Sequence, residues 1–235
     1  MAARTSQMKL TPELVKLCHR DVADNGEGDR YDYFRDADYD AAVEHLLANR
    51  PVSALWIFAY GSLIWKPDFE VAESRQGKLF GWHRSFCLRL TRYRGTLEQP
   101  GLMLCLDHGG SCDGLALRVP EGQESPVVNR LLQREIGSHE QLESVRWIGV
   151  QCGQDMIKAL TFYAGPSALD HYAGKIPLPE VARVLARACG HWGSGAEYLY
   201  NTVKHLEDSG IHDENLWELQ RLAAEEIISL QAIPL

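Results

Sequence analysis

The sequence predicts an α+β fold, in which a small mixed, barrel-like sheet is accompanied by helices. Short apolar segments separated by glycines run from Leu55 to Ala164, and the last third of the chain has the spacing of helices. The strand segments come first and the helices later, without strict alternation, which is typical of α+β proteins. With 235 residues, 45% of them apolar, the chain is long enough for one well-packed core.

The first 50 residues are predicted to form a helical extension (1–50) that precedes the main domain (51–235). Thr11 is placed to cap a helix whose first residue is Pro12, and the weak apolar face continues to Val22. The acidic stretch 29–40 is expected to be a loop, and a second helix is predicted from Asp40 to Asn49. Nothing in this extension suggests catalysis.

The run Leu55 to Ala59 is predicted to be a buried strand, and the chain is predicted to turn sharply after it. All five residues are apolar, and Gly61, just beyond Tyr60, has the conformational freedom that a turn requires. Backbone amides that follow such a turn are not committed to a sheet and can point at an anion. We therefore expect a binding site at the end of this strand.

The other elements follow from alternation, glycines and helical spacing. Lys78–Arg92 alternates in character along its length and is predicted to be a strand. The glycines at 109 and 110 predict a hairpin turn between two strands. The remaining predicted strands are 101–107, 113–119, 145–152 and 156–164, and the remaining predicted helices are 124–136, 179–188, 195–208 and 215–230.

The charge and the hydropathy exclude several classes of protein. A formal net charge of −8 argues against a nucleic-acid binder, which usually has a basic surface. No apolar run approaches the roughly 20 residues that a membrane helix needs, and the N-terminus lacks the apolar segment of a signal peptide. We therefore expect a cytoplasmic protein that acts on a small molecule, without nucleic-acid or membrane partners.

The six cysteines are predicted to be buried thiols, since none forms a C-x-x-C pair and a cytoplasmic chain keeps its thiols reduced. Cys105, His108 and Cys112 are close enough in sequence to suggest a metal site. A hairpin turn explains the same spacing without a metal, so we expect none. Pairing of a catalytic cysteine with one of the nine histidines stays an open alternative.

Basic residues cluster once, on and after the strand predicted at 78–92. They either hold a small carboxylate ligand or are ordinary outward-facing side chains of a strand, and the sequence does not decide between these interpretations. The residues are Arg84, Arg89, Arg92 and Arg94.

Glu135 and Ser62 are the candidate catalytic residues. Glu135 ends a largely apolar helix, and burial there would raise its pKa towards the range of a general base. The alternative is a solvated carboxylate paired with Arg130 or Arg134. Ser62 is a possible nucleophile, but it lacks the G-x-S-x-G context. The sequence also lacks a P-loop, G-x-G-x-x-G and H-E-x-x-H, so nothing supports a nucleotide cofactor or a metalloprotease site.

Several blocks of the sequence resemble one family, the ChaC family of glutathione-specific γ-glutamylcyclotransferases. The most specific block is 56–65, WIFAYGSLIW, followed by 77–84, GKLFGWHR, and then by Arg94-Gly95-Thr96 and Arg134-Glu135. The resemblance spans about residues 55 to 205 and implies a small mixed barrel with flanking helices. It implies no cofactor and no metal, with Glu135 as the catalytic acid/base. The substrate-binding residues that it implies are Ala59, Tyr60, Gly61, Ser62, Leu63, Ile64 and Tyr198.

The reaction that the resemblance implies is an intramolecular one: the cleavage of glutathione to 5-oxoproline and cysteinylglycine. The α-amine of the γ-glutamyl group attacks its own γ-carbonyl, so the enzyme mainly folds the substrate and moves a proton. Two alternatives stay open. The protein could cyclise other γ-glutamyl amino acids, or it could be a non-catalytic regulator that binds γ-glutamyl compounds.

Overall fold

A computed structural model describes residues 7–24, 26, 33–165 and 171–232. The chain divides into two compact units, each made of segments that are distant in sequence. Among the described residues, no helix is long and apolar enough to span a membrane. Unit 1 comprises Met1–Asn25, Arg89–Met103 and Ala173–Leu235, and unit 2 comprises Gly26–Leu88 and Leu104–Tyr172.

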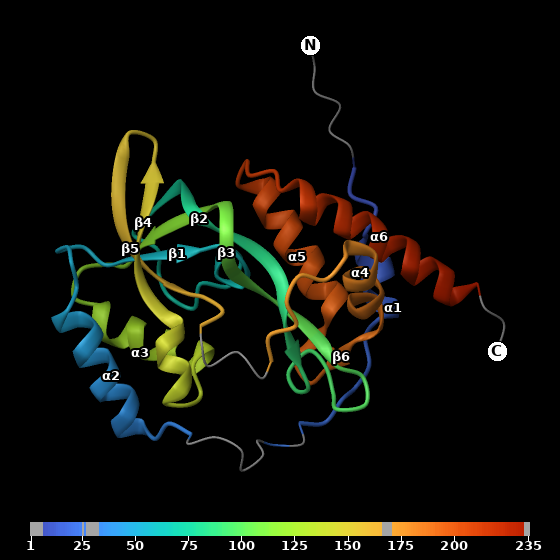
Figure 1. The fold of residues 1–235 in the computed structure, drawn as a ribbon, viewed down its shortest axis with the longest axis horizontal. Coiled ribbons are helices and arrows are strands. Elements are labelled where there is room, and N and C mark those ends of the chain that lie inside the picture. Colours follow the sequence, from blue (N-terminus) through green and yellow to red (C-terminus); the bar gives the residue numbers. More distant parts are fainter. Residues whose placement is uncertain (1–6, 25, 27–32, 166–170, 233–235) are drawn as a thin grey trace. The chain divides into compact units, whose positions relative to one another are not determined.

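Five strands close into a barrel in the order β1-β3-β2-β4-β5 (Figure 1), and all of β1, β4 and β5 and most of β2 and β3 belong to unit 2. Its sheet is mixed: β1 is parallel to β5 and antiparallel to β3, and β4 is antiparallel to β2 and to β5. The small mixed barrel predicted from the sequence is therefore confirmed. The strands are β1 (Trp56–Ala59), β2 (Glu73–Leu90), β3 (Gly101–Arg118), β4 (Val145–Cys152) and β5 (Asp155–Phe162).

Strand β1 is apolar throughout because both of its faces are buried. Trp56 and Phe58 belong to a cluster to which all five strands contribute, which is the interior of the barrel. Ile57 and Ala59 belong to a second cluster, outside the barrel wall, where two helices pack. Since side chains alternate between the faces of a strand, a run without polar residues is what such a strand requires.

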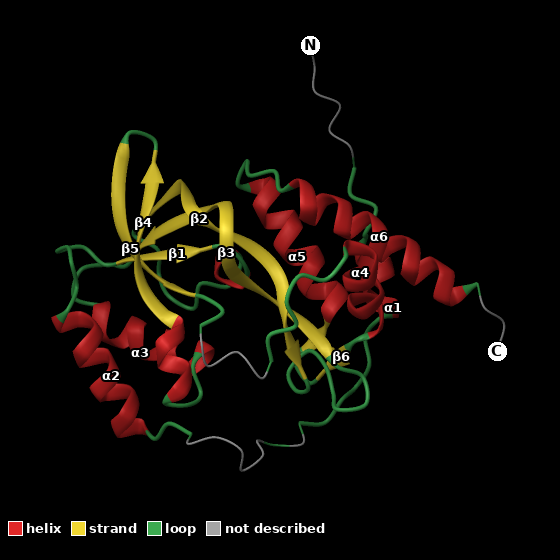
Figure 2. Ribbon diagram, viewed as in Figure 1, coloured by secondary structure: helices red, strands yellow, loops and turns green. Residues whose placement is uncertain are grey.

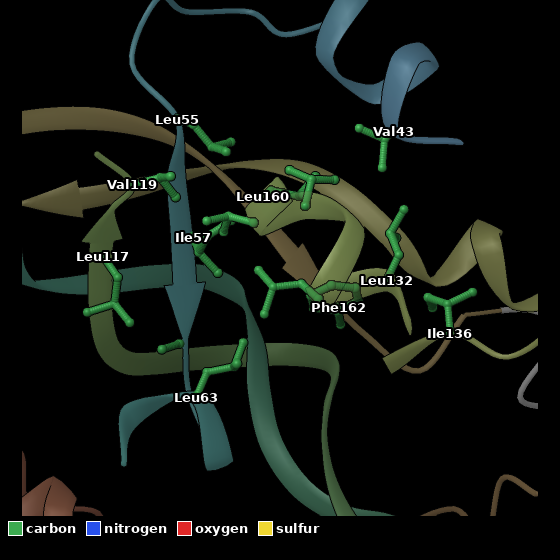
Figure 3. Packing of buried hydrophobic residues seen from close by; sticks show 14 of the residues in the cluster. Val43, Leu55, Ile57, Leu63, Leu117, Val119, Leu132, Ile136, Leu160 and Phe162 are labelled. Atoms are coloured by element: carbon green, nitrogen blue, oxygen red, sulfur yellow. The ribbon is translucent and has the colours of Figure 1, made fainter. Parts of the chain in front are cut away.

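The second cluster joins helices α2 (Asp36–Ala48) and α3 (Glu124–Glu135) to the barrel. Figure 3 shows side chains from α2, β1, α3 and β5 meeting there, among them Val43, Ile57 and Leu132. Helix α3 confirms the predicted helix at 124–136. Helix α2 begins four residues before the predicted Asp40. The Asp38 carboxylate accepts a hydrogen bond from the Arg35 backbone amide, which stabilises the first turn.

The predicted hairpin at the glycine pair is wrong, because β3 is one continuous strand of 18 residues. Gly109 and Gly110 have φ values of +102° and +68°, which bend and twist the strand without reversing it. Strand β2 stays beside it there, with Nδ1 of His83 lying 3.1 Å from the Gly109 carbonyl oxygen. Beyond the bend, β3 pairs with β1, from Leu115 opposite Ala59 to Arg118 opposite Trp56. One bent strand thus takes the place of two.

Unit 1 is mainly helical, and Figure 2 shows α4, α5 and α6 packed together within it. Thr11 caps α1 as predicted, but this helix ends at Leu17, well before the predicted Val22. None of its residues is buried, so no packing stabilises a longer helix. The helices are α1 (Pro12–Leu17), α4 (Leu178–Arg187), α5 (Gly195–Asp208) and α6 (Glu214–Gln231), and a short ladder joins β6 (Cys189–Gly190) to β7 (Gly193–Ser194).

The α+β class is confirmed, as are the predicted strands 145–152 and 156–164 and helices 179–188, 195–208 and 215–230, each within two residues at its ends. The strand predicted at 78–92 is also present, but β2 begins five residues earlier, at Glu73. The division into an extension (1–50) and a main domain (51–235) stays a prediction. Of the acidic stretch predicted as a loop, residues 29–32 lie outside the described part of the chain, and 36–40 are helical.

Candidate active site

The turn after β1 forms where the sequence predicted it. Gly61 has a φ of −141°, so the turn does not use the left-handed conformation that glycine makes available. A single 3-10 turn, η1 (Ser62–Ile64), follows, and the Ile64 amide donates to the Gly61 carbonyl. Among the described residues, the amides of Ser62 and Leu63 have no backbone acceptor. Both amides can therefore bind an anion.

The side chains of the turn have different surroundings. Ala59 and Leu63 are buried in the core outside the barrel wall, so only their backbone can face a ligand. Tyr60, Ser62 and Ile64 are partly exposed. The Tyr60 hydroxyl donates to the thiol sulfur of Cys105 at 3.7 Å, and the Tyr60 carbonyl accepts from the buried Arg84 guanidinium at 2.6 Å.

Glu135 is the last residue of α3, and its side chain is 28% exposed. Burial of the carboxyl group raises its pKa, the neighbouring Arg134 guanidinium lowers the pKa, and Asp68 raises it again; burial is the largest of the three effects. Nε of Arg134 lies 3.1 Å from a Glu135 carboxylate oxygen. The predicted rise in pKa is thus present, together with the ion pair that the alternative interpretation expected.

Arg134 brings the two candidates together. One of its terminal nitrogens donates to the Ser62 hydroxyl at 2.8 Å, while Nε contacts Glu135. Its other terminal nitrogen donates to the Lys66 carbonyl at 2.5 Å and to the Asp68 carboxylate. The turn after β1 and the end of α3 therefore lie together in unit 2, where they make up the candidate site.

A serine nucleophile finds no support in this geometry. The hydroxyl of Ser62 is bonded to a guanidinium, which donates hydrogen bonds and cannot remove a proton. Cysteine nucleophiles are also disfavoured, since all six thiols are buried. Burial raises the pKa of the Cys105 thiol to about 12 and that of Cys18 to about 11, so both stay protonated at neutral pH.

Tyr198 lies in α5 of unit 1, whereas the other predicted site residues lie in unit 2. It is buried, and the Arg94 guanidinium lies 5.3 Å from the centre of its ring. Its role as a substrate contact stays a prediction.

The arginines that cluster in the sequence have separate partners. Arg84 donates to the Tyr60 carbonyl, Arg92 pairs with Asp24, and Arg94 pairs with Glu197 at 2.9 Å. Each of these three side chains thus has a protein partner, and a carboxylate site at the cluster stays a prediction. No group of three or more histidine, cysteine or acidic side chains in the described part of the chain could hold a metal ion.

The contacts of Arg134 and Asp68 were not expected from the sequence, in which Arg134 is one of two arginines that could pair with a solvated Glu135. Pro67-Asp68 is a turn signal directly after the resembling block, and it marks the loop that Arg134 binds. No pattern within the sequence indicates that the guanidinium reaches across to this loop.

Comparison with solved structures defines the class of the fold. The chain is similar to the crystal structure of a γ-glutamyl cyclotransferase specific to glutathione from yeast, with a TM-score of 0.65. The match covers 74% of this chain and 97% of that one at 19% sequence identity. The fold is therefore that of the γ-glutamyl cyclotransferases.

Comparison of sequences identifies the family. The sequence model of ChaC-like proteins matches residues 55–226. This chain belongs to the ChaC family, as the resemblance in its sequence implied.

Two curated relatives are named for the same activity. The chain is 37% identical to the glutathione-specific γ-glutamylcyclotransferase of Escherichia coli over 180 residues, which cover 76% of this chain and 77% of that protein. It is 34% identical to the human glutathione-specific γ-glutamylcyclotransferase 1 over 169 residues, 69% of this chain and 75% of that protein.

Proposed function

We propose that this protein cleaves glutathione to 5-oxoproline and cysteinylglycine. Membership of the ChaC family and the names of its relatives support the reaction. The observation that carries the assignment to this site is the position of Arg134, which contacts both the Ser62 hydroxyl and the Glu135 carboxylate. Anion-binding amides and a proton-transferring group thus lie together.

The amides of Ser62 and Leu63 bind the γ-glutamyl end of the substrate. An α-carboxylate, or the oxyanion that develops on the γ-carbonyl, accepts hydrogen bonds from such preorganised donors. Holding the γ-glutamyl group folded places its amine beside its own carbonyl, and orientation of this kind supplies on the order of 7–11 kcal/mol in well-placed cases. The turn therefore acts as the substrate grip.

Glu135 transfers the proton. The substrate amine is an ammonium at neutral pH, and it becomes a nucleophile once Glu135 removes a proton. The amine nitrogen then bonds to the γ-carbon, and Glu135 returns the proton to the cysteinyl nitrogen as the bond between that nitrogen and the γ-carbon breaks. The second proton of the ring nitrogen passes to the released amine, which leaves as an ammonium, so the product is the neutral lactam. Burial raises the pKa of Glu135 and so makes its carboxylate a stronger base. No nucleophile from the protein and no cofactor takes part.

The protein is proposed to act in the cytoplasm. All six cysteines are unpaired buried thiols, which is typical of a reducing compartment.

The test is incubation of the purified protein with glutathione, with 5-oxoproline and cysteinylglycine measured by mass spectrometry. Both products are expected in equal amounts. γ-Glutamylalanine, which lacks the glycine carboxylate, is the matched comparison. Preferential turnover of γ-glutamylalanine would instead support a broader γ-glutamyl amino acid cyclotransferase. Binding of both compounds without product would support a non-catalytic regulator.

A further inference from the structure

The loop that follows the substrate grip contains a residue in an uncommon conformation. Asp68 has a φ of +61°, in the left-handed region that residues other than glycine rarely adopt. Aspartate tolerates this region better than most residues, but such a conformation persists only where the surroundings hold it. Here the Asp68 carboxylate is bound by Arg134, which also binds the carbonyl of Lys66. One side chain therefore holds the loop on both sides of Pro67.

The same guanidinium uses its remaining nitrogens on the reacting parts of the site. It bonds the Ser62 hydroxyl at 2.8 Å and contacts the Glu135 carboxylate at 3.1 Å. The Arg134 side chain is only 16% exposed, so water does not screen these contacts strongly. Arginine is suited to this because its planar fork offers five donors in fixed directions.

The Arg134 guanidinium consequently contacts two carboxylates, that of Asp68 and that of Glu135. Arg134 alone would keep Glu135 ionised and weakly basic, because an adjacent cation stabilises a carboxylate. The negative charge of Asp68 offsets the effect of the Arg134 charge on the pKa of Glu135. The charge of Glu135 in turn helps to raise the pKa of the Cys105 thiol on β3, which burial, the largest effect, keeps protonated and which accepts a hydrogen bond from the Tyr60 hydroxyl.

We propose that Arg134 and Asp68 form a positioning pair for Glu135: Arg134 fixes the carboxylate relative to the substrate grip, and Asp68 holds Arg134 in place and offsets its charge. This inference rests on the proposed function, and it assigns positioning roles to two residues outside the substrate grip and the acid/base.

The matched test of Asp68 is D68N. Asparagine keeps the size of the side chain and tolerates the left-handed conformation, but it removes the negative charge. The pKa of Glu135 is then expected to fall, since Asp68 raises it and Arg134 lowers it. The acidic limb of kcat against pH for 5-oxoproline formation moves to lower pH. kcat at neutral pH falls by less than the about 10²–10⁴-fold that one acid/base group contributes.

The control is D155N, which removes one aspartate charge from another arginine pair of unit 2, with Arg75 at 3.3 Å. Its pH profile is expected to coincide with that of the wild type. R134K tests the other half of the proposal. Lysine keeps the positive charge but cannot bond the loop, Ser62 and Glu135 together, so KM should rise more than kcat falls.

A purely structural role for the pair predicts a different result. D68N and R134K would then lower the melting temperature without moving the acidic limb, and an unmoved limb in folded D68N would overturn the proposal. If D68N does not fold, D68G, which suits the positive φ and also removes the carboxylate, is expected to show the same displacement.

A readout that does not need turnover separates this inference from the proposed function. The Glu135 carboxyl carbon can be titrated by ¹³C NMR, with its signal assigned by its absence in E135Q. A lower pKa in D68N supports the positioning pair whether or not glutathione is cleaved, and an unchanged pKa contradicts it. Absence of product from the wild type would remove the proposed function alone.

Discussion

Each unit of the molecule contains an arginine–glutamate pair of almost the same length, and the two pairs lie in different surroundings. In unit 1, Arg94 lies 2.9 Å from Glu197, bonds the Ser194 carbonyl and covers the ring of Tyr198. In unit 2, Arg134 lies 3.1 Å from Glu135. The Glu197 side chain is 44% exposed, whereas Glu135 is 28% exposed and burial raises its pKa. Similar pairs thus serve structure in one unit and, as we propose, chemistry in the other.

An ion pair by itself therefore does not identify a catalytic carboxylate. What distinguishes Glu135 is the second carboxylate on its arginine and the turn that the same arginine binds. At Glu197, Arg94 is instead committed to a backbone carbonyl and an aromatic ring.

Among the changes that distinguish the Arg134–Glu135 pair from the Arg94–Glu197 pair, the loss of activity in E135Q is expected to be the largest. Glutamine keeps the shape of the side chain but cannot remove a proton from the substrate amine, so 5-oxoproline formation should fall about 10²–10⁴-fold. Initial rates with glutathione measure the effect, and circular dichroism confirms folding. Turnover like that of the wild type would end the assignment of Glu135.

S62A is expected to have a smaller effect, because Ser62 positions the substrate grip and does not attack. The variant loses the hydrogen bond from Arg134, and bonds to charged groups contribute about 1.5–3 kcal/mol. A fall in kcat/KM of roughly 10- to 100-fold follows, with the amides of the turn intact. An acyl adduct on Ser62 of the wild type, detected by intact-protein mass spectrometry, would support the nucleophile mechanism instead.

E135Q is also expected to change the stability of the protein, in a direction that depends on pH. Because burial raises the pKa of Glu135 above its unfolded value of about 4.3, the folded state binds the proton more tightly. The wild type therefore loses stability as the pH rises from that value through the raised pKa. Glutamine does not titrate, so E135Q does not lose stability in this way as the pH rises. Its melting temperature should therefore exceed that of the wild type at pH 7 and not at pH 4.

Thermal unfolding of the two proteins at both pH values measures this difference. For a chain of this size, 1 kcal/mol corresponds to about 2–4 °C. A melting temperature of E135Q below that of the wild type at pH 7 would show that the pair with Arg134 outweighs the cost of burial.

The smallest expected effect is that of E197Q, the matched change in unit 1. A half-exposed ion pair contributes less than about 1 kcal/mol, and the glutamine oxygen can still accept from Arg94. The melting temperature should change slightly, and the pH profile of turnover should stay that of the wild type. A displaced acidic limb in E197Q would remove the distinction between the two pairs.

Most of the fold follows from local patterns. Alternation, apolar runs and helical spacing predicted β4, α3 and α5 within one residue at each end, because those elements bury one consistent face. The predicted hairpin at Gly109 failed because two consecutive glycines favour a turn and a bulge alike, and only pairing with a distant strand selects between them.

The site was predictable in part. Tyr60, Ser62 and Glu135 were identified by resemblance, and the structure brings Ser62 and Glu135 together through Arg134. Asp68 was not predictable, because its role depends on a contact across 66 residues with the guanidinium. Burial of Glu135 likewise depends on elements that pack against α3, which its own sequence does not specify.

The most direct test of Glu135 as the acid/base is the pH dependence of kcat for 5-oxoproline formation from glutathione. If Glu135 is the acid/base and burial raises its pKa, the acidic limb of the wild type lies above the ordinary glutamate value of about 4.3, and the residual activity of E135Q lacks that limb. A limb at the ordinary glutamate value, or the same limb in both proteins, would contradict the account.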